Sequence, residues 1–335
     1  MNQWRKIVIL SLKIGIGSSM AMYAAEMLNL DHAVSAGTIT LLTLMNSKWE
    51  TLKISACRFV TFTVTVLIAW MLFSHIHSEW IAYGMLLTIL VFITETVKWR
   101  ATISVNGVIA AHLVTNHDFS DIAVWNEFLL IVIGVVFAIL LNLFYANAGH
   151  KNHIIRNMRV VEEKLQMLLG ALAAYLSNKE MQYSVWEEIC LLEKEIQKCI
   201  EEAYEYQSNT LHSHPEYYIL YFEMRFHQCQ ILHNLHYEMK RIRTMPDEAK
   251  LVADYILYLA EFVTEFNDPK KQIIRLNEMI QNMKERSLPK TREEFEGRAI
   301  LYHILMDVEE FLKCKMRFVQ KLDSEKRKKY WKKNL

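Results

Sequence analysis

Proline and charged residues are scarce in the first part of this sequence. Four prolines occur in 335 residues, and none precedes Pro215. The first 150 residues hold eight basic and eight acidic side chains, whereas the remaining residues hold 30 and 29. Glycine is distributed the other way, with seven of its nine residues in the first 150. Such a shift in composition predicts a membrane domain followed by a water-soluble domain.

Cysteine and catalytic motifs are scarce as well. The five cysteines form no C-x-x-C pair, which argues against a zinc ribbon or a redox motif. Four of them lie in the charged second part, where scattered thiols fit a reducing, cytosolic compartment. The sequence contains no P-loop, nucleophile motif, pair of catalytic carboxylates or kinase signature. We therefore expect no enzyme activity, no catalytic residue and no cofactor.

An alternating strand pattern is also missing, so we expect an all-α protein. Six apolar runs occur in the first part, at residues 7–25, 32–46, 56–74, 80–94, 102–115 and 126–146. The last run contains Phe128–Ala146, nineteen residues with no charge and one amide, Asn142. As a helix it would cover roughly 28 Å, the thickness of a bilayer hydrocarbon core. These runs predict a six-helix transmembrane bundle over residues 1–148.

Lysine and arginine are absent from every second loop between the runs. If the N-terminus is inside, the inner segments contain Arg5, Lys6, Lys48, Lys53, Arg58, Lys98, Arg100, Lys151, Arg156 and Arg159. The titratable residues of the outer loops are acidic residues and histidines. This positive-inside pattern predicts a multi-pass protein of the cell membrane with both termini in the cytoplasm. Three of the runs are short and polar and must pack against protein in the lipid bilayer, so we expect a homo-oligomer, with a dimer favoured.

Polar residues inside the apolar runs are the candidates for a substrate-binding site. Lys13 lies within the first run, where it either has a function or extends its ammonium to the inner surface. Arg58 opens the third run, where it either binds an anion or anchors the helix at the interface. The remaining candidates also have explanations in helix packing or hydrogen bonding, and they are Gly37, Thr38, Thr40, Asn106 and His112.

The order of motifs in this part resembles a known family. A small and threonine-rich second run (Ser35–Thr38) is followed by a basic loop (Lys48–Lys53) and a third run headed by Arg58. This order is similar to that of the aromatic acid exporter family, which is allied to the fusaric-acid-resistance-like membrane proteins. The resemblance covers residues 1–150 by motif and the rest by architecture. The second run departs from the family pattern, because Asp31-His32-Ala33 stands where a proline and aromatic residues are expected.

The resemblance implies an integral membrane transporter that exports small organic anions, in particular aromatic carboxylic acids. Without an ATP site, transport would depend on an ion or proton gradient. The alternative is a membrane-anchored sensor or scaffold whose cytoplasmic helices bind a protein partner. A transporter needs a polar cavity near the middle of the membrane, lined by Lys13, Thr38, Thr40 or Asn106, whereas a scaffold would be closed and apolar there.

The second part is predicted to be an antiparallel helical bundle over residues 149–324. Apolar residues from Ile154 to Tyr175 follow a seven-residue repeat, the pattern of a coiled coil, and residues 185–203 repeat it. Prolines and turn residues mark the later helices. The last helix is expected to begin near Thr291, because Glu294 stands at capping-box spacing from it.

Two further patterns have alternative explanations. Cys229, His233 and His236 share one helix face, but three ligands on one helix rarely surround an ion, so we expect a polar bundle face and no metal. The basic tail at residues 325–335 is either solvated or in contact with a membrane surface, where Tyr330 and Trp331 would suit the headgroup layer. No nucleic-acid-binding module is recognisable, and we expect no nucleic-acid partner.

Overall fold

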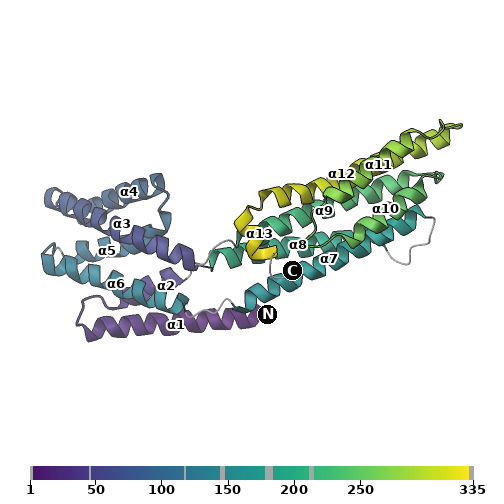
Figure 1. Cartoon of the computed structure of the whole chain (residues 1–335). Coiled ribbons are helices and arrows are strands. Elements are labelled where there is room, and N and C mark those ends of the chain that lie inside the picture. The colour runs from purple at the N-terminus through teal and green to yellow at the C-terminus, as the bar shows by residue number, and fades with distance from the viewer. Residues whose placement is uncertain are drawn as a thin grey trace. The chain divides into compact units, whose positions relative to one another are not determined.

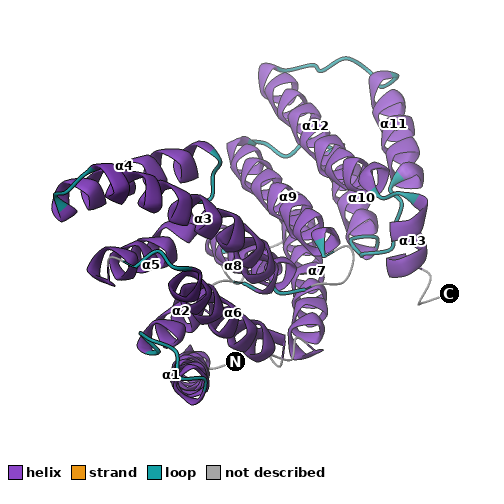
Figure 2. Cartoon of the chain, turned by 90° about the vertical axis from the view of Figure 1, so that its left-hand side faces the viewer, coloured by secondary structure: helices purple, strands orange, loops and turns teal. Residues whose placement is uncertain are grey.

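The computed structural model describes residues 3–44, 47–116, 118–143, 148–177, 184–210 and 215–331. Within these ranges every regular element is helical, which confirms the all-α class (Figures 1 and 2). The described residues divide into two compact units. The first unit contains the helices up to residue 143, and the second contains the helices from Ala148 onward.

The first unit is built from apolar helices. Its elements are α1 (Gln3–Met27), α2 (Val34–Leu44), α3 (Lys48–His75), α4 (Glu79–Thr96), a 3₁₀ turn η1 (Arg100–Thr102), α5 (Ile103–Asn116) and α6 (Asp121–Leu143). Among the described residues, four helices are long and apolar enough to cross a membrane, namely α1, α3, α4 and α6. We therefore call this part the membrane unit. The helices α2 and α5 have 11 and 14 residues, and their crossing of the membrane stays a prediction.

Small residues let α2 pack closely between α1 and α6 (Figure 2). A Cβ atom on Gly37 would lie 2.9 Å from the Ser18 carbonyl oxygen of α1. A Cβ atom on Gly134 of α6 would lie 2.6 Å from Ile39 Cγ2 of α2. Both distances are too short for a real side chain, so these two glycines are required for the helices to approach. Gly37 thus has the packing role that was one of its two sequence explanations.

Helix α3 begins at Lys48, earlier than predicted, because residues 48–53 were expected in a loop and the third run was expected to begin at residue 56. The cause is a local helix-start signal. The Ser47 backbone N–H and hydroxyl donate to a Glu50 carboxylate oxygen at 3.4 Å and 3.1 Å. Both bonds join the residue before the helix to its third residue, as the Glu of a capping box does, and they start α3 before its apolar part begins.

The second unit, which we call the bundle unit, contains seven helices among its described residues. They are α7 (Ala148–Leu176), α8 (Val185–Ser208), α9 (Glu216–Arg241), α10 (Ala249–Glu261), α11 (Lys270–Lys284), α12 (Arg292–Lys321) and α13 (Ser324–Trp331). The helices α9 and α12 run side by side, and α7 packs against α9 and α10 (Figure 1). The repeat between Ile154 and Leu172 is buried in this unit's own core, so its packing occurs within one chain. Thr291 caps α12 as expected, since its hydroxyl accepts from the Glu294 backbone N–H at 3.1 Å.

The predicted basic tail is part of the bundle unit in its described portion. Residues up to Trp331 form α13, and the Tyr330 ring stacks on the Tyr217 ring with centroids 4.0 Å apart. The Trp331 indole N–H donates to the Tyr217 hydroxyl at 3.3 Å. The two aromatic residues therefore pack on the bundle unit, and contact of the tail with a membrane surface stays a prediction. The last four residues of the tail, 332–335, lie outside the described residues.

Candidate functional site

Five polar side chains from four helices form a hydrogen-bonded chain at one end of the membrane unit. The Lys13 ammonium of α1 donates to Oδ1 of Asn142 on α6. The Asn142 amide nitrogen donates to the Thr51 hydroxyl of α3 at 2.8 Å, and that hydroxyl donates to the Thr43 carbonyl oxygen of α2 at 3.3 Å. The Arg58 guanidinium of α3 donates to the Thr43 hydroxyl. We call these five residues the polar chain, and it links the two basic candidates of the sequence analysis.

Arg58 is the most unusual member of the polar chain. Its side chain is 1% exposed, and its Nε has no hydrogen-bond partner. Within the described part of the membrane unit, no carboxylate lies within ion-pair distance of it. A buried cation is costly in a low-dielectric surrounding unless an anion or several acceptors meet it. Arg58 therefore retains both charge and donor capacity that its protein neighbours do not use.

Lys13 is placed beside Asn142 by the close approach of α1 and α6. A Cβ atom on Gly17, one turn after Lys13, would lie 2.3 Å from Leu141 Cδ1 and 3.2 Å from Leu44 Cδ1. The missing side chain thus brings α1 against the end of α6 that carries Asn142. The half-buried Lys13 ammonium meets a neutral amide there, so the two cations of the polar chain are joined through neutral groups.

A second polar cluster lies at the opposite end of the membrane unit. His112 of α5 contacts Glu127 of α6 through Nδ1 and Oε2 at 3.0 Å, and its Nε2 lies 3.2 Å from the Ser35 hydroxyl. The His32 ring, in the α1–α2 loop, stacks on the His112 ring with centroids 4.1 Å apart. His112 is therefore hydrogen-bonded to a carboxylate side chain of the protein. We call the end with Lys13 and Arg58 the basic end, and this opposite end the acidic end.

Glu127 stands at the start of the last apolar run (126–146), where an acidic residue of an outer loop is expected. In the structure α6 begins at Asp121, so Glu127 lies more than a turn inside the helix and is 3% exposed. A cavity of about 400 Å³ adjoins it and is lined by Asp31, His112, Asp118, Asn126 and Glu127 together with apolar side chains. The acidic end thus has an open, negatively charged site that was not anticipated from the sequence.

The two parts of the chain match two descriptions from one protein family. Residues 5–145 match "Aromatic acid exporter family member 1", and residues 151–316 match "Putative aromatic acid exporter C-terminal domain". This chain belongs to the aromatic acid exporter family. The four spanning-length helices agree with that membership, and this exporter-family chain is a membrane-embedded protein of the transporter type.

Two individual proteins are also similar to this exporter-family chain. An "Uncharacterized protein YqjA" from Bacillus subtilis (strain 168) is 29% identical over 313 residues, which cover 93% of this chain and 96% of that protein. A solved structure described as "putative membrane protein from Clostridium difficile 630" has a TM-score of 0.45 and 24% sequence identity. The similarity covers 50% of this chain and 98% of that one.

The other candidates from the sequence lie apart from the polar chain of this exporter-family protein. Thr40 is buried and donates to the carbonyl oxygens of Ala36 and Gly134 at 2.9 Å and 3.1 Å, so it ties α2 to α6. Thr38 is exposed and bonds to its own helix. Asn106 is fully buried in α5, where its amide nitrogen donates to the Thr102 carbonyl oxygen at 3.1 Å and its Oδ1 has no partner.

Three members of the polar chain were missed by the sequence analysis as site residues. Asn142 had a visible signal, since it is the one amide in the charge-free run. Thr43 and Thr51 had none, because threonines are frequent in these helices and most of them bond to their own helix, as Thr61 and Thr94 do. Which threonines face a cation depends on how the helices pack.

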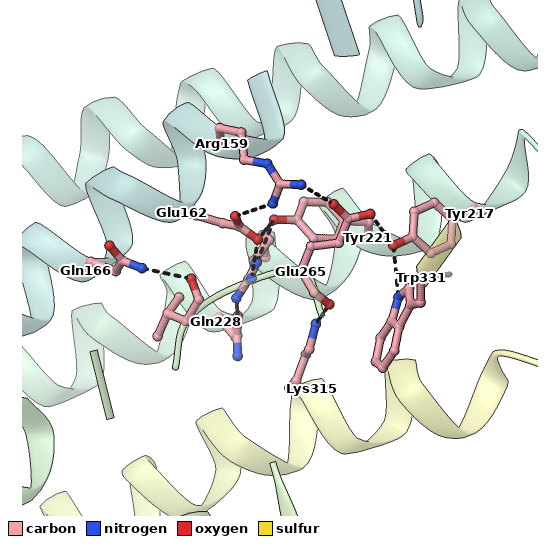
Figure 3. Close-up of polar contacts among 11 residues, drawn as sticks. Arg159, Glu162, Gln166, Tyr217, Tyr221, Gln228, Glu265, Lys315 and Trp331 are labelled. Carbon is pink, nitrogen blue, oxygen red and sulfur yellow. Dashed lines mark hydrogen bonds and ion pairs between the residues drawn. The ribbon is translucent and has the colours of Figure 1, made fainter. Parts of the chain in front are cut away.

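The bundle unit contains a buried network of charged and phenolic groups (Figure 3). Glu162 of α7 accepts from Arg159 at 2.9 Å, from the Tyr221 hydroxyl at 2.7 Å and from Arg225 at 3.0 Å. Glu265, which follows α10, accepts from Arg159 at 2.7 Å and from the Tyr217 hydroxyl at 2.6 Å. The Lys315 ammonium of α12 donates to the Glu265 carbonyl oxygen at 2.7 Å. We call this set the bundle network.

The bundle network is an internal structural feature, because its carboxylates are occupied by partners of the same unit. Burial raises the pKa of the Glu265 carboxyl. Burial also lowers the pKa of the Lys315 ammonium well below its usual 10.5. The charges join α7, α9 and α12 to the segment after α10 (Figure 3). These pairings depend on residues far apart in the chain, so they could not be predicted from the sequence.

The residues of the metal motif considered in the sequence contact separate partners. The Cys229 thiol lies 3.6 Å from the Ile189 carbonyl oxygen, and His233 lies 3.3 Å from a Glu193 oxygen. His236 packs against the Trp186 ring with centroids 5.8 Å apart. These contacts describe a helix face packed on α8, which is the polar bundle face expected from the sequence.

Proposed function

We propose that this protein exports small organic anions, and aromatic carboxylic acids in particular, and that Arg58 and Lys13 receive the carboxylate. The observation that carries the proposal is the buried Arg58 guanidinium, whose hydrogen-bond partner is the neutral Thr43 hydroxyl. A guanidinium is planar and can bind both oxygens of a carboxylate at once. A carboxylate would therefore supply a negative charge and a second acceptor oxygen, which the single Thr43 hydroxyl does not.

The neutral members of the polar chain hold the two cations when no substrate is present. Asn142 bonds to Lys13 with one end of its amide and to Thr51 with the other. A carboxylate that reached Lys13 would replace the Asn142 oxygen, and Asn142 would remain hydrogen-bonded to Thr51. Exchange of one acceptor for another costs less than exposure of an unpaired buried charge. The polar chain can thus accept and release an anion without leaving either cation isolated.

The distribution of basic residues supports a cytoplasmic position of the basic end, and we propose that the substrate binds from that side. Lys48 and Lys53 begin α3 near the polar chain, and Arg100 begins the turn η1. By the positive-inside rule we place the basic end, both termini and the bundle unit on the cytoplasmic side of the cell membrane. A substrate would then bind from the cytoplasm and leave at the acidic end. Because the sequence has no P-loop, we propose an ion or proton gradient as the energy source.

Flux of aromatic acids through proteoliposomes tests the proposal. We expect Lys13→Met to abolish export, because a methionine keeps the length of the side chain and removes its charge. Arg58→Lys should reduce export roughly ten- to hundredfold, because a charge-assisted hydrogen bond worth about 1.5–3 kcal/mol is lost with the planar fork. The matched control is Lys53→Met, which removes an exposed charge from the same helix as Arg58.

Expression level and size-exclusion profile must be unchanged in each variant, so that a folding defect is recognised. Normal flux in well-folded Lys13→Met and Arg58→Lys would remove both residues from the site. Loss of flux in Lys53→Met as well would mean that charge at the basic end acts without a specific site.

The second candidate is a membrane-anchored sensor or scaffold with a protein partner. It is favoured by one observation, a groove of about 440 Å³ between α9 and α12 whose lining includes Glu223, His227, Glu310, Arg317 and Lys321. Absence of flux in the unaltered protein, for a panel of aromatic acids, would favour this candidate.

For either function we propose that the protein is a homodimer, because the short helices α2 and α5 need protein around them in the membrane. A monomer by light scattering in mild detergent would contradict this proposal.

A further inference from the structure

The acidic end brings together three side chains that can bind a metal ion. They are His32 of the α1–α2 loop, His112 of α5 and Glu127 of α6. One ligand atom from each lies within 4.8 Å of the other two. From this geometry we propose that His32, His112 and Glu127 bind one divalent transition-metal ion of the Zn²⁺ class. The proposal concerns the acidic end alone and does not depend on what the polar chain transports.

The donor set selects the kind of ion. Two imidazole nitrogens and one carboxylate oxygen form a combination typical of Zn²⁺ and its neighbours, whereas Ca²⁺ and Mg²⁺ prefer oxygen ligands alone. In a tetrahedral zinc site the ligand atoms are about 3.3 Å apart. His112 Nδ1 and Glu127 Oε2, 3.0 Å apart, are already close to that spacing. The widest pair lies within 4.8 Å and would have to close by up to about 1.5 Å, and the exposed His32 side chain is the ligand placed to move.

His112 and Glu127 already lie close enough to each other to be ligands of one ion. Nδ1 of His112 lies 3.0 Å from Oε2 of Glu127. An ion between them would exchange this hydrogen bond for two coordination bonds. The other ring nitrogen, Nε2, lies 3.2 Å from the Ser35 hydroxyl. In the tautomer with the proton on Nε2, this hydroxyl accepts a hydrogen bond from the Nε2–H, and Nδ1 is available as the ligand. A hydrogen bond from the second ring nitrogen is a regular feature of metal-binding histidines.

Asn126 positions both the Glu127 carboxylate and the loop that carries His32. Its amide nitrogen donates to Glu127 Oε1 at 3.4 Å and to the Asp31 carbonyl oxygen at 3.2 Å. Its Oδ1 accepts the Asp31 backbone N–H at 2.8 Å. One side chain thus orients the carboxylate ligand and also fixes the loop residue next to His32. His32 itself has a φ of 58°, an uncommon backbone angle that the fixed loop maintains beside His112.

The surroundings favour entry of a cation and leave a coordination position open. The cavity of about 400 Å³ is lined by His112 and Glu127, and the carboxylates of Asp31 and Asp118 also line it. A cleft with one sign of charge raises the local concentration of the opposite ion. Three protein ligands beside an open cavity leave room for water or an anionic group as the fourth ligand. A bound ion would connect the α1–α2 loop, α5 and α6, and it would hold this end of the membrane unit closed.

Zinc binding by the full-length protein in detergent tests the inference. The protein is freed of metal with a chelator and titrated with ZnCl₂ by calorimetry. We expect the unaltered protein to bind one more equivalent of Zn²⁺ than His32→Ala, and we expect Glu127→Gln to bind at that site at least tenfold more weakly. Asn126→Ala should weaken binding roughly ten- to hundredfold, as is usual for residues that orient a ligand. The matched control is His77→Ala, an exposed histidine of another loop, which should bind as the unaltered protein does.

Because His32 is exposed, His32→Ala should fold normally, and an unchanged melting temperature without zinc verifies this. Zinc should raise the melting temperature of the unaltered protein and of His77→Ala by more than that of His32→Ala. The inference is overturned if the unaltered protein binds no zinc. It is equally overturned if His32→Ala and Glu127→Gln bind the same number of ions with the same affinity as the unaltered protein.

Discussion

Arg58 and Lys315 are both buried cations, and their surroundings differ in one respect. Lys315 is 4% exposed, donates to the Glu265 carbonyl oxygen and lies in the field of Glu162 and Glu265. Arg58 is buried as deeply, but its contact is a threonine hydroxyl. The bundle network thus supplies acidic groups within the fold, whereas the polar chain supplies none. A buried cation beside acidic groups, such as Lys315, can have a purely structural role. A buried cation without them, such as Arg58, is suited to bind an anion.

Replacement of Lys315 by methionine should change how stability depends on pH. Burial lowers the folded-state pKa of Lys315 below its unfolded value of about 10.4. Between these two values the unfolded chain binds more protons, so the free energy of unfolding rises with pH in the unaltered protein. Lys315→Met should lack this rise. Chemical unfolding in detergent, followed by circular dichroism between about pH 7 and about pH 9.5, measures the difference.

The control for this experiment is Lys313→Met, which removes an exposed lysine of the same helix that pairs with Glu309 at 2.8 Å. Its pH profile should run parallel to that of the unaltered protein. Parallel profiles for Lys315→Met would contradict the expectation and would mean that Lys315 is equally easy to protonate in both states.

Charges in apolar runs are conspicuous, and this is why Lys13 and Arg58 could be selected from the sequence. Their connection could not be predicted, because it passes through Thr43 and Thr51, whose side chains have no distinguishing pattern. Glu127 was missed for a different reason. A carboxylate near the start of an apolar run is ordinarily in the headgroup region, and only its pairing with His112 explains its burial.

Helix packing in the membrane unit depends on the absence of side chains at two positions of α2 and α6. Gly134→Ala would place a Cβ atom 2.6 Å from Ile39 Cγ2 and 2.9 Å from the Ala36 carbonyl oxygen. Overpacking of this kind costs about 1–3 kcal/mol, so we expect a lower melting temperature and a lower yield of folded protein. The hydrogen bond that ties α2 to α6 should also be disturbed, because the Thr40 hydroxyl donates to the Gly134 carbonyl oxygen.

The matched control is Gly84→Ala in α4, where nothing lies within 4 Å of the new Cβ atom. It should be neutral or slightly stabilising, since alanine has the higher helix propensity. Melting curves of the two variants, recorded by intrinsic fluorescence in the same detergent, give the comparison. Equal stability of the two variants would show that α2 and α6 can separate without cost.

Helix starts were predictable where a local signal marks them. Pro215 precedes α9, Pro269 precedes α11 and Thr291 caps α12, and these positions agree with the turn residues noted in the sequence. The start of α3 was not predicted, because the basic residues Lys48 and Lys53 were assigned to a loop by charge. In a membrane protein a positive charge indicates a position at the inner surface of the bilayer. It does not indicate a loop, because a helix can extend past that surface.

The side of the membrane on which each unit lies is a prediction at the scale of the whole molecule. We expect a cysteine placed at Ser78 or Ser120 to react with a membrane-impermeant reagent added to intact cells, and a cysteine at Ser324 to remain unlabelled. The reason is that Ser78 and Ser120 precede α4 and α6 at the acidic end, whereas Ser324 begins α13 of the bundle unit. The background is a variant in which the five native cysteines are replaced by serine.

Permeabilised cells supply the control for this labelling, since all three positions should then react. Labelling of Ser324→Cys in intact cells would overturn the cytoplasmic placement of the bundle unit.

The all-α class and the division of the chain into two parts could be predicted from hydropathy and charge, which are averages over many residues. The crossings by α2 and α5 do not follow in the same way, because helices of 11 and 14 residues are shorter than the bilayer core.

The separation of Lys13 and Arg58 from Asp31, Asp118 and Glu127 has an electrical consequence. If the basic end faces a cytoplasm at negative potential, the membrane potential drives an organic anion out of the cell. Each elementary charge that crosses about 100 mV gains about 2.3 kcal/mol. That energy sustains a roughly fiftyfold higher concentration of a monovalent anion outside the cell. The membrane potential would then act together with the ion or proton gradient proposed above, and the rate of export would fall when the membrane is depolarised, even with equal pH on both sides.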